Sequence, residues 1–176
     1  MRKVIVYISM SLDGFLAGPD DSIEFLDSID HGDETYGYND FVAGVDTYIV
    51  GNKTYQVVTK LTGGEFPQKD QFDCYVLTRN PDHPPVENIT FYSGDINELI
   101  ENIKLKPGKN IYCDGGAAVF KLFLENNLVD KLIVAVIPII IGKGTRLFLE
   151  SDVYQKVKLM NSKSYENGLV QLEYDF

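Results

Sequence analysis

The sequence predicts an α/β fold, in which a mainly parallel central sheet is flanked by helices in three layers and ends in antiparallel strands. Short apolar segments alternate with helical segments through the first two-thirds of the 176 residues, a pattern typical of parallel strands joined by helices. The last part of the chain is rich in strand signals only, and Asn167-Gly168 predicts a hairpin within it. The length fits a single domain over residues 1–176.

The first half is predicted to hold four strands and one clear helix. Val4 to Met10 is short, β-branched and nearly all apolar, as a buried strand is. Glycine, proline and aspartate mark a loop from Asp13 to Asp21, and a polar, partly helical region runs from Ser22 to Gly44. The other elements expected here are a strand over Thr47 to Val50, a helix over Asn52 to Lys60, and strands over Cys74 to Thr78 and Ile89 to Tyr92.

The second half begins with a helix and ends with strands. Asp95-Ile96-Asn97-Glu98 resembles a capping box and opens a helix that ends near Lys104. A strand over Ile111 to Cys113 precedes a helix over Gly116 to Asn127, whose apolar residues recur at helical spacing. The remaining strands are expected over Leu132 to Ile137 and Ile139 to Ile141 (on either side of Pro138), Val157 to Met160, and Leu169 to Tyr174.

Charge and composition exclude several classes of protein. The chain carries 16 Lys and Arg against 26 Asp and Glu, a net charge of −10, so no nucleic-acid partner is expected. No signal peptide and no membrane-spanning segment are recognised, which predicts a cytoplasmic protein without a membrane partner. The two cysteines lie in apolar runs and are interpreted as core residues. His31 and His83 are isolated in polar segments, so no metal site is predicted.

Three predicted strands end in sequences suited to a phosphate group. The strand ending at Val50 runs into Gly51-Asn52-Lys53-Thr54, the strand from Cys74 ends in Thr78-Arg79, and the strand from Ile111 runs into Asp114-Gly115-Gly116-Ala117-Ala118. A helix N-terminus offers free N–H groups, and glycine lets a ligand approach the backbone. Each turn alone could be glycine-rich for packing only. Together they predict a ligand site, because ligands of open α/β sheets bind across the carboxyl ends of the strands.

The same segments resemble the dihydrofolate reductase superfamily, and more closely the reductase domain of the bifunctional deaminase-reductase of bacterial riboflavin biosynthesis. The resemblance covers nearly the whole chain. Its motifs are Ser9-Met10-Ser11-Leu12-Asp13-Gly14-Phe15-Leu16-Ala17, the run from Asp46 to Tyr55, Val76-Leu77-Thr78-Arg79, the run from Ile111 through Gly116, Asn127-Leu128-Val129-Asp130-Lys131, and the run from Ile137 to Phe148. The last of these is the most specific, because it places two apolar segments around a proline before Gly-x-Gly-x-x-Leu-Phe.

The resemblance implies a dihydrofolate-reductase-like fold and NADPH as hydride donor. It places Gly51, Asn52, Lys53 and Thr54 by the cofactor phosphates, Thr78 and Arg79 by the 2′-phosphate, Ser9 and Met10 beside the nicotinamide, and Gly115, Gly116, Ala117, Ala118 and Val119 along the pyrophosphate and nicotinamide. The superfamily usually has arginine where Asn52 stands, which leaves Lys53 and Arg79 to supply positive charge. The function implied is an NADPH-dependent reductase of a small heterocyclic or sugar-linked substrate.

The catalytic group is less well marked than the cofactor site. Asp13 matches an aspartate near the active-site mouth in the riboflavin-type motif and is the predicted catalytic residue. The alternative is a loop aspartate that hydrogen-bonds its own turn. Glu34 and Asp40 lie in a polar stretch and are interpreted as a solvated face. The segment from Asp13 to Asp40 is acidic, unlike the basic segment that holds a phosphorylated ribose in riboflavin synthesis, which favours a stand-alone reductase.

Two other functions remain open from the sequence: a true dihydrofolate reductase, and a catalytically silent nucleotide-binding scaffold. A homodimer is also predicted. Leu132 to Ile141 is almost entirely aliphatic, more than one interior strand face requires, and an exposed apolar surface usually marks association. The riboflavin-type reductases pair through their late strands, so the resemblance implies the same. The alternative is that these strands are buried on both faces within one chain.

Overall fold

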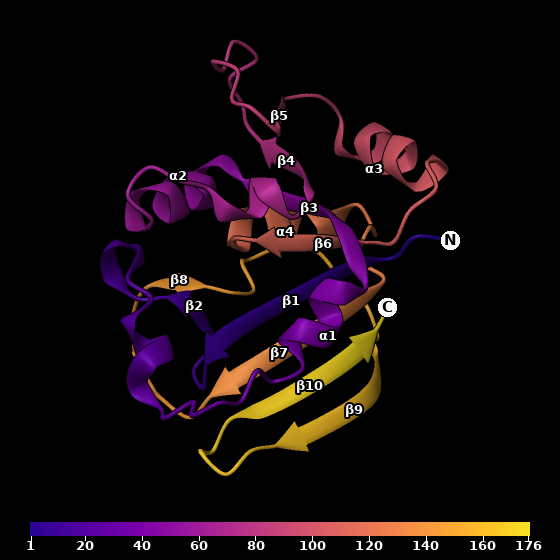
Figure 1. Cartoon of the computed structure of the whole chain (residues 1–176). Coiled ribbons are helices and arrows are strands. Elements are labelled where there is room, and N and C mark those ends of the chain that lie inside the picture. Colours follow the sequence, from indigo (N-terminus) through magenta and orange to yellow (C-terminus); the bar gives the residue numbers. More distant parts are fainter.

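The computed structural model describes all residues from Met1 to Phe176 and confirms the mainly parallel sheet with antiparallel strands at its C-terminal side. Eight strands lie in the order β5-β4-β3-β6-β1-β7-β10-β9 (Figure 1). The parallel strands are β1 (Val4–Ser11), β3 (Val45–Gly51), β4 (Asp73–Leu77), β5 (Ile89–Tyr92), β6 (Asn110–Gly115) and β7 (Lys131–Ile137). β10 (Val170–Asp175) pairs antiparallel with β7 on one side and with β9 (Lys158–Ser164) on the other.

Helices cover both faces of this sheet, which confirms the three layers. On one face, α3 (Ile96–Leu105) and α4 (Ala117–Glu125) pack Ile100 and Phe120 against Val6 of β1 and Ile49 of β3. On the other face, α1 (Tyr38–Ala43) and α2 (Asn52–Leu61) add Phe41 and Tyr55 to a cluster around Tyr48. Side chains alternate along a strand, so Tyr48 and Ile49 enter opposite layers. None of the helices has the length and apolarity needed to cross a membrane.

The predicted strand over Ile139 to Ile141 is wrong. After Pro138 the chain turns: the N–H of Ile139 bonds the carbonyl of Ile137 at 2.8 Å, and the carbonyl of Ile139 accepts from Leu12 N–H at 2.8 Å. Ile139 and Ile141 instead pack against a small cluster that contains Phe25 and Leu169. These residues are therefore apolar because they are partly buried outside the sheet. In the sequence, three apolar residues of this kind look the same as a short buried strand.

Two short strands form where loops were expected. β2 (Phe15–Ala17) and β8 (Thr145–Arg146) pair antiparallel as a separate two-stranded sheet. The hairpin at Asn167-Gly168 is confirmed between β9 and β10, but only Gly168 takes a positive φ, of +86°. Its N–H bonds the carbonyl of Tyr165 at 2.9 Å, which closes the turn.

The region from Ser22 to Gly44 contains the 3₁₀ turn η2 (Glu24–Ser28) and the helix α1, as the partly helical prediction requires. Another 3₁₀ turn, η1 (Pro19–Asp21), precedes it. Phe25 anchors the region on β7 and β10, where it packs with Ala135 and Leu169. Tyr7 donates to the carbonyl of Tyr36 at 2.9 Å. The region therefore lies over the end of β1, next to the site described below.

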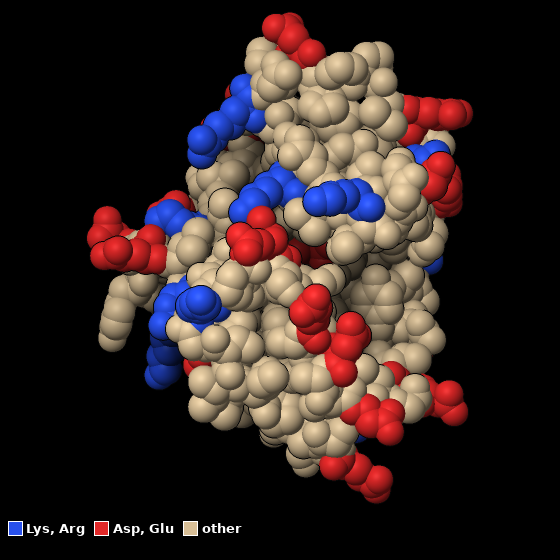
Figure 2. All heavy atoms as spheres, turned by 90° about the vertical axis from the view of Figure 1, so that its left-hand side faces the viewer, with Lys and Arg blue, Asp and Glu red and all other residues tan.

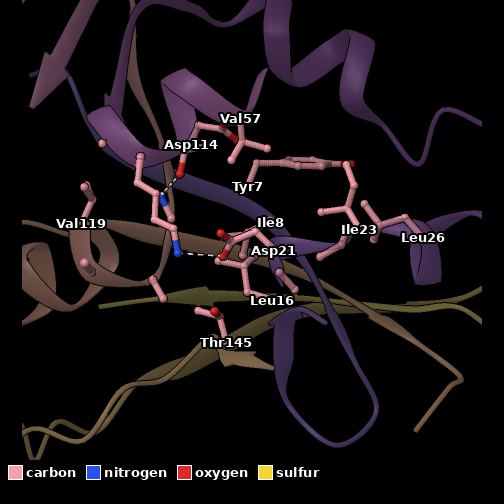
Figure 3. A pocket seen from close by; sticks show the side chains of 18 of the residues that line it. Tyr7, Ile8, Leu16, Asp21, Ile23, Leu26, Val57, Asp114, Val119 and Thr145 are labelled. Carbon is pink, nitrogen blue, oxygen red and sulfur yellow. Dashed lines mark hydrogen bonds and ion pairs between the residues drawn. The ribbon is translucent and has the colours of Figure 1, made fainter. Parts of the chain in front are cut away.

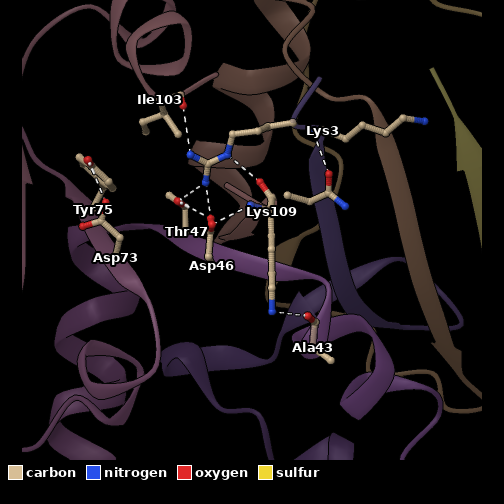
Figure 4. A network of polar contacts seen from close by, with 10 residues as sticks. Lys3, Ala43, Asp46, Thr47, Asp73, Tyr75, Ile103 and Lys109 are labelled. Atoms are coloured by element: carbon tan, nitrogen blue, oxygen red, sulfur yellow. Dashed lines mark hydrogen bonds and ion pairs between the residues drawn. The ribbon is translucent and has the colours of Figure 1, made fainter. Parts of the chain in front are cut away.

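Arg2 joins several elements at the opposite end of the parallel strands (Figure 4). Its guanidinium donates to the carbonyl of Ile103 at 3.1 Å and of Lys109 at 2.6 Å, to the hydroxyl of Thr47 at 2.6 Å, and to the carboxylate of Asp46. The Arg2 side chain is only 7% exposed. Because this buried guanidinium donates to groups of β3 and to the carbonyl of Ile103 in α3, it fixes the start of β1 against both elements.

Candidate functional site

A cavity of about 530 Å³ opens where β1, β3 and β6 end and where α2 and α4 begin. The turns η1 and η2 supply its other side (Figure 3). Figure 2 shows this face of the molecule as hollowed near its centre, with acidic side chains scattered below and to the right of the hollow. The volume is typical of small-molecule sites. The position at the carboxyl ends of the strands matches the expectation for an open α/β sheet.

Two helix N-termini point into this cavity without side-chain caps. The residue before α2 is Gly51 and the residue before α4 is Gly116, and neither of these cap residues has a side chain that accepts from the first N–H groups of its helix. The start of α3, away from the cavity, is capped by Asp95, which accepts from the N–H groups of Asn97 and Glu98. The free N–H groups of α2 and α4 thus remain available at the positive ends of two helix dipoles.

The two helix starts lie close together because the residues between them are small. A Cβ added at Gly51 would lie 2.9 Å from Cγ2 of Val119. The N–H of Gly116 donates to the hydroxyl of Thr54 at 3.0 Å, which joins the first turn of α2 to the start of α4. Gly51, Thr54, Gly116 and Val119 all line the cavity, as do the predicted residues Ser9, Lys53, Ala117 and Ala118. Most of the predicted cofactor residues are therefore brought to one place.

Lys53 is ion-paired across the mouth of the cavity. Its Nζ lies 2.8 Å from Oδ1 of Asp21, on η1 (Figure 3). The Lys53 side chain is 74% exposed and that of Asp21 is 34% exposed. Asp20 and Asp21 both have positive φ, 57° and 60°, a conformation rare outside glycine and tolerated best by Asp and Asn.

Three predicted residues lie next to the cavity but are not part of its lining. Met10 packs against the main core, and Gly115 has a φ of +90° and forms a cis peptide bond with Gly116. Asn52 is the first residue of α2, and its Oδ1 is buried without a hydrogen-bond partner. An acceptor buried in this way has a desolvation cost that nothing in the chain offsets.

Thr78 and Arg79 follow the end of β4, one strand beyond the cavity. Leu77 at the end of β4 pairs with Gly51 at the end of β3. Thr78 and Arg79, which follow Leu77, therefore lie at the same edge of the sheet as the start of α2. The hydroxyl of Thr78 accepts from the N–H of Asn80 at 3.1 Å. Arg79 is exposed and makes no ion pair with any residue of the chain. Its charge is therefore available to a ligand that extends past Gly51.

Asp13 does not line the cavity. Its carboxylate accepts from the Ser11 hydroxyl at 2.6 Å, from Gly142 N–H at 2.8 Å and from Ile141 N–H at 3.3 Å. The hydrogen bond from Ser11, followed by that from Gly142, lowers the pKa of Asp13. Asp13 thus bonds Ser11 of its own turn, as the alternative from the sequence requires, and also holds the distant loop that follows β7, which that alternative did not include. A direct part in catalysis stays a prediction.

Besides Asp21 at the mouth, the carboxylate that lines the cavity is Asp114, which the sequence marked only as part of a glycine-rich turn. Asp114 accepts from the Tyr112 hydroxyl at 2.6 Å and from the Tyr48 hydroxyl. Burial raises the pKa of Asp114 above its ordinary value, while the hydrogen bonds from Tyr112 and Tyr48 oppose the rise. A signal was available, because Tyr112 and Asp114 are two residues apart in one strand and so share a face.

The end of the cavity beyond Asp114 is aromatic and apolar. Tyr7, Tyr38, Ile23 and Leu26 contribute to it. In Figure 3, Tyr7, Ile23 and Leu26 lie at one end and Val119 at the other. The rings of Tyr7 and Tyr38 meet edge to face with centroids 5.4 Å apart. The site therefore has one end formed by the two helix N-termini and one apolar end, with a buried carboxylate between them.

A protein-family model, that of the RibD C-terminal domain, matches residues 2–171. The chain belongs to the RibD C-terminal domain family. Relatives of this RibD-type domain include the uncharacterized proteins YwjB and YyaP of Bacillus subtilis (strain 168). YwjB is 38% identical over 173 residues, 98% of this chain and 97% of YwjB, and YyaP is 26% identical over 98% of this chain and 94% of YyaP.

Solved structures share the fold of this RibD-type domain. A Shewanella sp. PV-4 protein provisionally assigned to riboflavin biosynthesis superposes with a TM-score of 0.87 at 24% identity, over 98% of both chains. The Thermotoga maritima diaminohydroxyphosphoribosylaminopyrimidine deaminase/5-amino-6-(5-phosphoribosylamino)uracil reductase gives 0.75 at 16% identity, over 99% of this chain and 56% of that one. These likenesses confirm the predicted dihydrofolate-reductase-like architecture.

Proposed function

We propose that this protein is an NADPH-dependent reductase that transfers a hydride to a small heterocyclic substrate. The observation that carries the proposal is the pair of uncapped, glycine-preceded helix N-termini of α2 and α4, which open into one cavity. Such termini bind phosphate through N–H groups and the helix dipole. Membership of the RibD C-terminal domain family and the fold of the Thermotoga maritima reductase support the same function.

The residues around the cavity fit a dinucleotide in both shape and donor chemistry. Gly51 lets Val119 pack against the start of α2, because a Cβ at Gly51 would lie 2.9 Å from Cγ2 of Val119, and Thr54 aligns the two helix starts through Gly116. Arg79 carries a free charge where an adenosine 2′-phosphate would extend, which favours NADPH over NADH. The nicotinamide coenzyme supplies the hydride when it is bound.

Asp114 provides the group that holds a proton beside the reacting atoms. Burial favours its protonated form, and the hydroxyls of Tyr48 and Tyr112 fix its orientation. Hydride transfer depends above all on orientation, and Ile23 and Leu26 provide an apolar wall at the substrate end against which a ring can be oriented.

Titration with NADPH and NADH tests this function. We expect NADPH to bind with a dissociation constant in the micromolar range or below, which corresponds to roughly −8 kcal/mol. Gly51→Val should abolish binding of both cofactors, because its side chain would clash with Val119 and displace the start of α4 from the start of α2. A protein that shows no thermal shift or fluorescence change with millimolar NADPH would contradict the proposal.

We also propose that the chain forms a homodimer. β7 itself is an interior strand, between β1 and β10, and Val134 is only 3% exposed, so the aliphatic density of β7 is used within the chain. The edge of the sheet on this side is β9, where Leu159 is 51% and Met160 48% exposed. An edge strand with exposed apolar side chains is a ready surface for a second copy.

A further inference from the structure

A second hollow, of about 410 Å³, lies at the opposite end of the parallel strands from the cavity described above. It is formed where α1 and α3 end and where β1, β3 and β6 begin. Its lining includes the cationic residues Arg2, Lys104, Lys106 and Lys109 and contains no Asp or Glu, although the chain as a whole has a net charge of −10. A concave surface lined by charges of one sign concentrates counter-ions. The lining of this basic hollow therefore attracts anions.

The loop that carries two of the lysines is held in place by Arg2 (Figure 4). The Arg2 guanidinium donates to the carbonyl of Lys109 at 2.6 Å, and Asp46 accepts from the N–H of the same lysine at 2.7 Å. A Cβ added at Gly108 would lie 2.5 Å from Oδ2 of Asp46 and 2.9 Å from Cζ of Arg2, so the loop lies directly against this ion pair. The backbone that presents Lys106 and Lys109 is therefore fixed before any ligand binds, which lowers the entropy cost of binding.

The charges of Lys106 and Lys109 are not neutralised within the chain. Lys106 is exposed and makes no ion pair. Nζ of Lys109 donates to the carbonyl of Ala43 at 2.9 Å, a partner without net charge. Lys104, in contrast, pairs with Asp130 at 3.0 Å. The basic hollow thus keeps two lysine charges for a ligand.

The other lining residues favour a compact ligand with several negative charges. Asn110 adds a neutral donor, because its Oδ1 accepts from the N–H of Lys3 at 3.0 Å and its Nδ2 amide stays free. No aromatic side chain lines the hollow, so a nucleoside base would gain no stacking there. A single exposed ion pair contributes little, so an anion has to meet both free lysines to bind measurably. Linked phosphate groups supply several charges and acceptor oxygens in a small volume.

We propose that the basic hollow is a second ligand site, which binds a compact polyphosphate group through Lys106, Lys109 and the amide of Asn110. Such a group occurs both in free pyrophosphate and in the phosphate chain of a nucleotide. The site lies at the opposite end of the sheet from the proposed cofactor site, so a ligand in one does not exclude a ligand in the other. The inference does not depend on the reductase function.

Calorimetric titration of the full chain with pyrophosphate, with and without saturating NADPH, tests the proposal. We expect a dissociation constant below about 1 mM in both cases, and binding at least about fivefold tighter than that of inorganic phosphate. Uridine diphosphate distinguishes the two sources of the ligand. Binding equal to or weaker than that of pyrophosphate indicates a free polyphosphate, and tighter binding at the same lysines indicates a nucleotide.

Two double variants with the same change in net charge assign the binding to the basic hollow. Lys106→Gln/Lys109→Gln should weaken pyrophosphate at least about tenfold. Lys60→Gln/Lys156→Gln should leave its affinity unchanged, because these exposed lysines lie outside the hollow and make no ion pairs. Lys106→Gln alone removes no ion pair of the folded chain and should still weaken pyrophosphate about threefold.

Absence of pyrophosphate binding at millimolar concentration would overturn the proposed site. An unchanged affinity in Lys106→Gln/Lys109→Gln, or an equal loss in both double variants, would overturn it as well. Failure of NADPH to bind would instead contradict the reductase function and would leave the result for the basic hollow intact, because pyrophosphate is also measured without NADPH.

Discussion

The raised pKa of Asp114 makes a prediction about stability that needs no ligand. Its ordinary pKa is 3.8, and burial raises the folded-state pKa above that value. Between these two pKa values the folded protein holds a proton that the unfolded chain has lost, so the contribution of Asp114 to stability is greatest below pH 3.8 and is lost as the pH rises through the folded-state pKa. Asp114→Asn removes this titration and keeps a side chain of the same shape.

The size of the effect follows from the single proton involved. Across the window that starts near the ordinary pKa, the free energy of unfolding of the wild type should fall relative to Asp114→Asn by up to about 1.4 kcal/mol per pH unit. Above the folded-state pKa the difference should be constant. The other carboxylates titrate alike in both proteins and cancel.

Urea unfolding at a series of pH values measures this difference. Tyr112→Phe is the matched second variant, because loss of its hydroxyl removes a hydrogen bond that lowers the pKa of Asp114. In Tyr112→Phe the decline should therefore continue to higher pH than in the wild type. A difference between the wild type and Asp114→Asn that stays flat with pH, or that changes in the opposite direction, would refute the argument for a buried, proton-holding carboxylate.

Four further predictions follow from other parts of the molecule. Arg79→Ala should weaken the binding of NADPH about 10- to 100-fold and leave the binding of NADH unchanged in calorimetry, because a charge-assisted hydrogen bond to the 2′-phosphate is lost. An equal loss of affinity for both cofactors would indicate a structural role for Arg79. Asp21→Asn should tighten the binding of NADPH a few-fold, because Lys53 loses its ion-pair partner; the effect should stay under about 1 kcal/mol because the pair is exposed. Weaker binding of NADPH by this variant would contradict a role of Lys53 at the phosphates. Arg2→Met should lower the free energy of unfolding by about 3 kcal/mol in urea, because Asp46 and two carbonyls lose a buried partner; a loss below about 1 kcal/mol would show that water replaces the guanidinium. Light scattering should give a mass near twice 19.8 kDa, and Met160→Asp should return it to that of one chain; a wild-type monomer would disprove the dimer.

The amino-acid sequence determined the elements of the sheet and the cofactor end of the site. β-branched runs such as Val4 to Met10 and the Asp95 helix cap are local signals, and both are confirmed, although Glu98 does not bond back to Asp95 as a full capping box would require. Gly51 to Thr54 and Gly116 to Val119 were found for the same reason: a glycine between a strand and a helix shows in the sequence as a place where a ligand can approach the backbone.

Only the tertiary structure decided the substrate end. Tyr48, Tyr112 and Asp114 come from two strands, and the Tyr48 bond to Asp114 spans 66 positions of the chain, so no local pattern reports it. The same holds for Ile139 to Ile141. Ile139 and Ile141 are apolar because they pack against the cluster around Phe25, and the sequence alone does not separate this case from a strand. Burial and desolvation, which set the pKa of Asp114, depend on residues distant in sequence. The sequence by itself therefore marks the helix starts at which we propose that a cofactor binds, whereas the carboxylate of Asp114 comes to line the cavity only when the sheet is assembled.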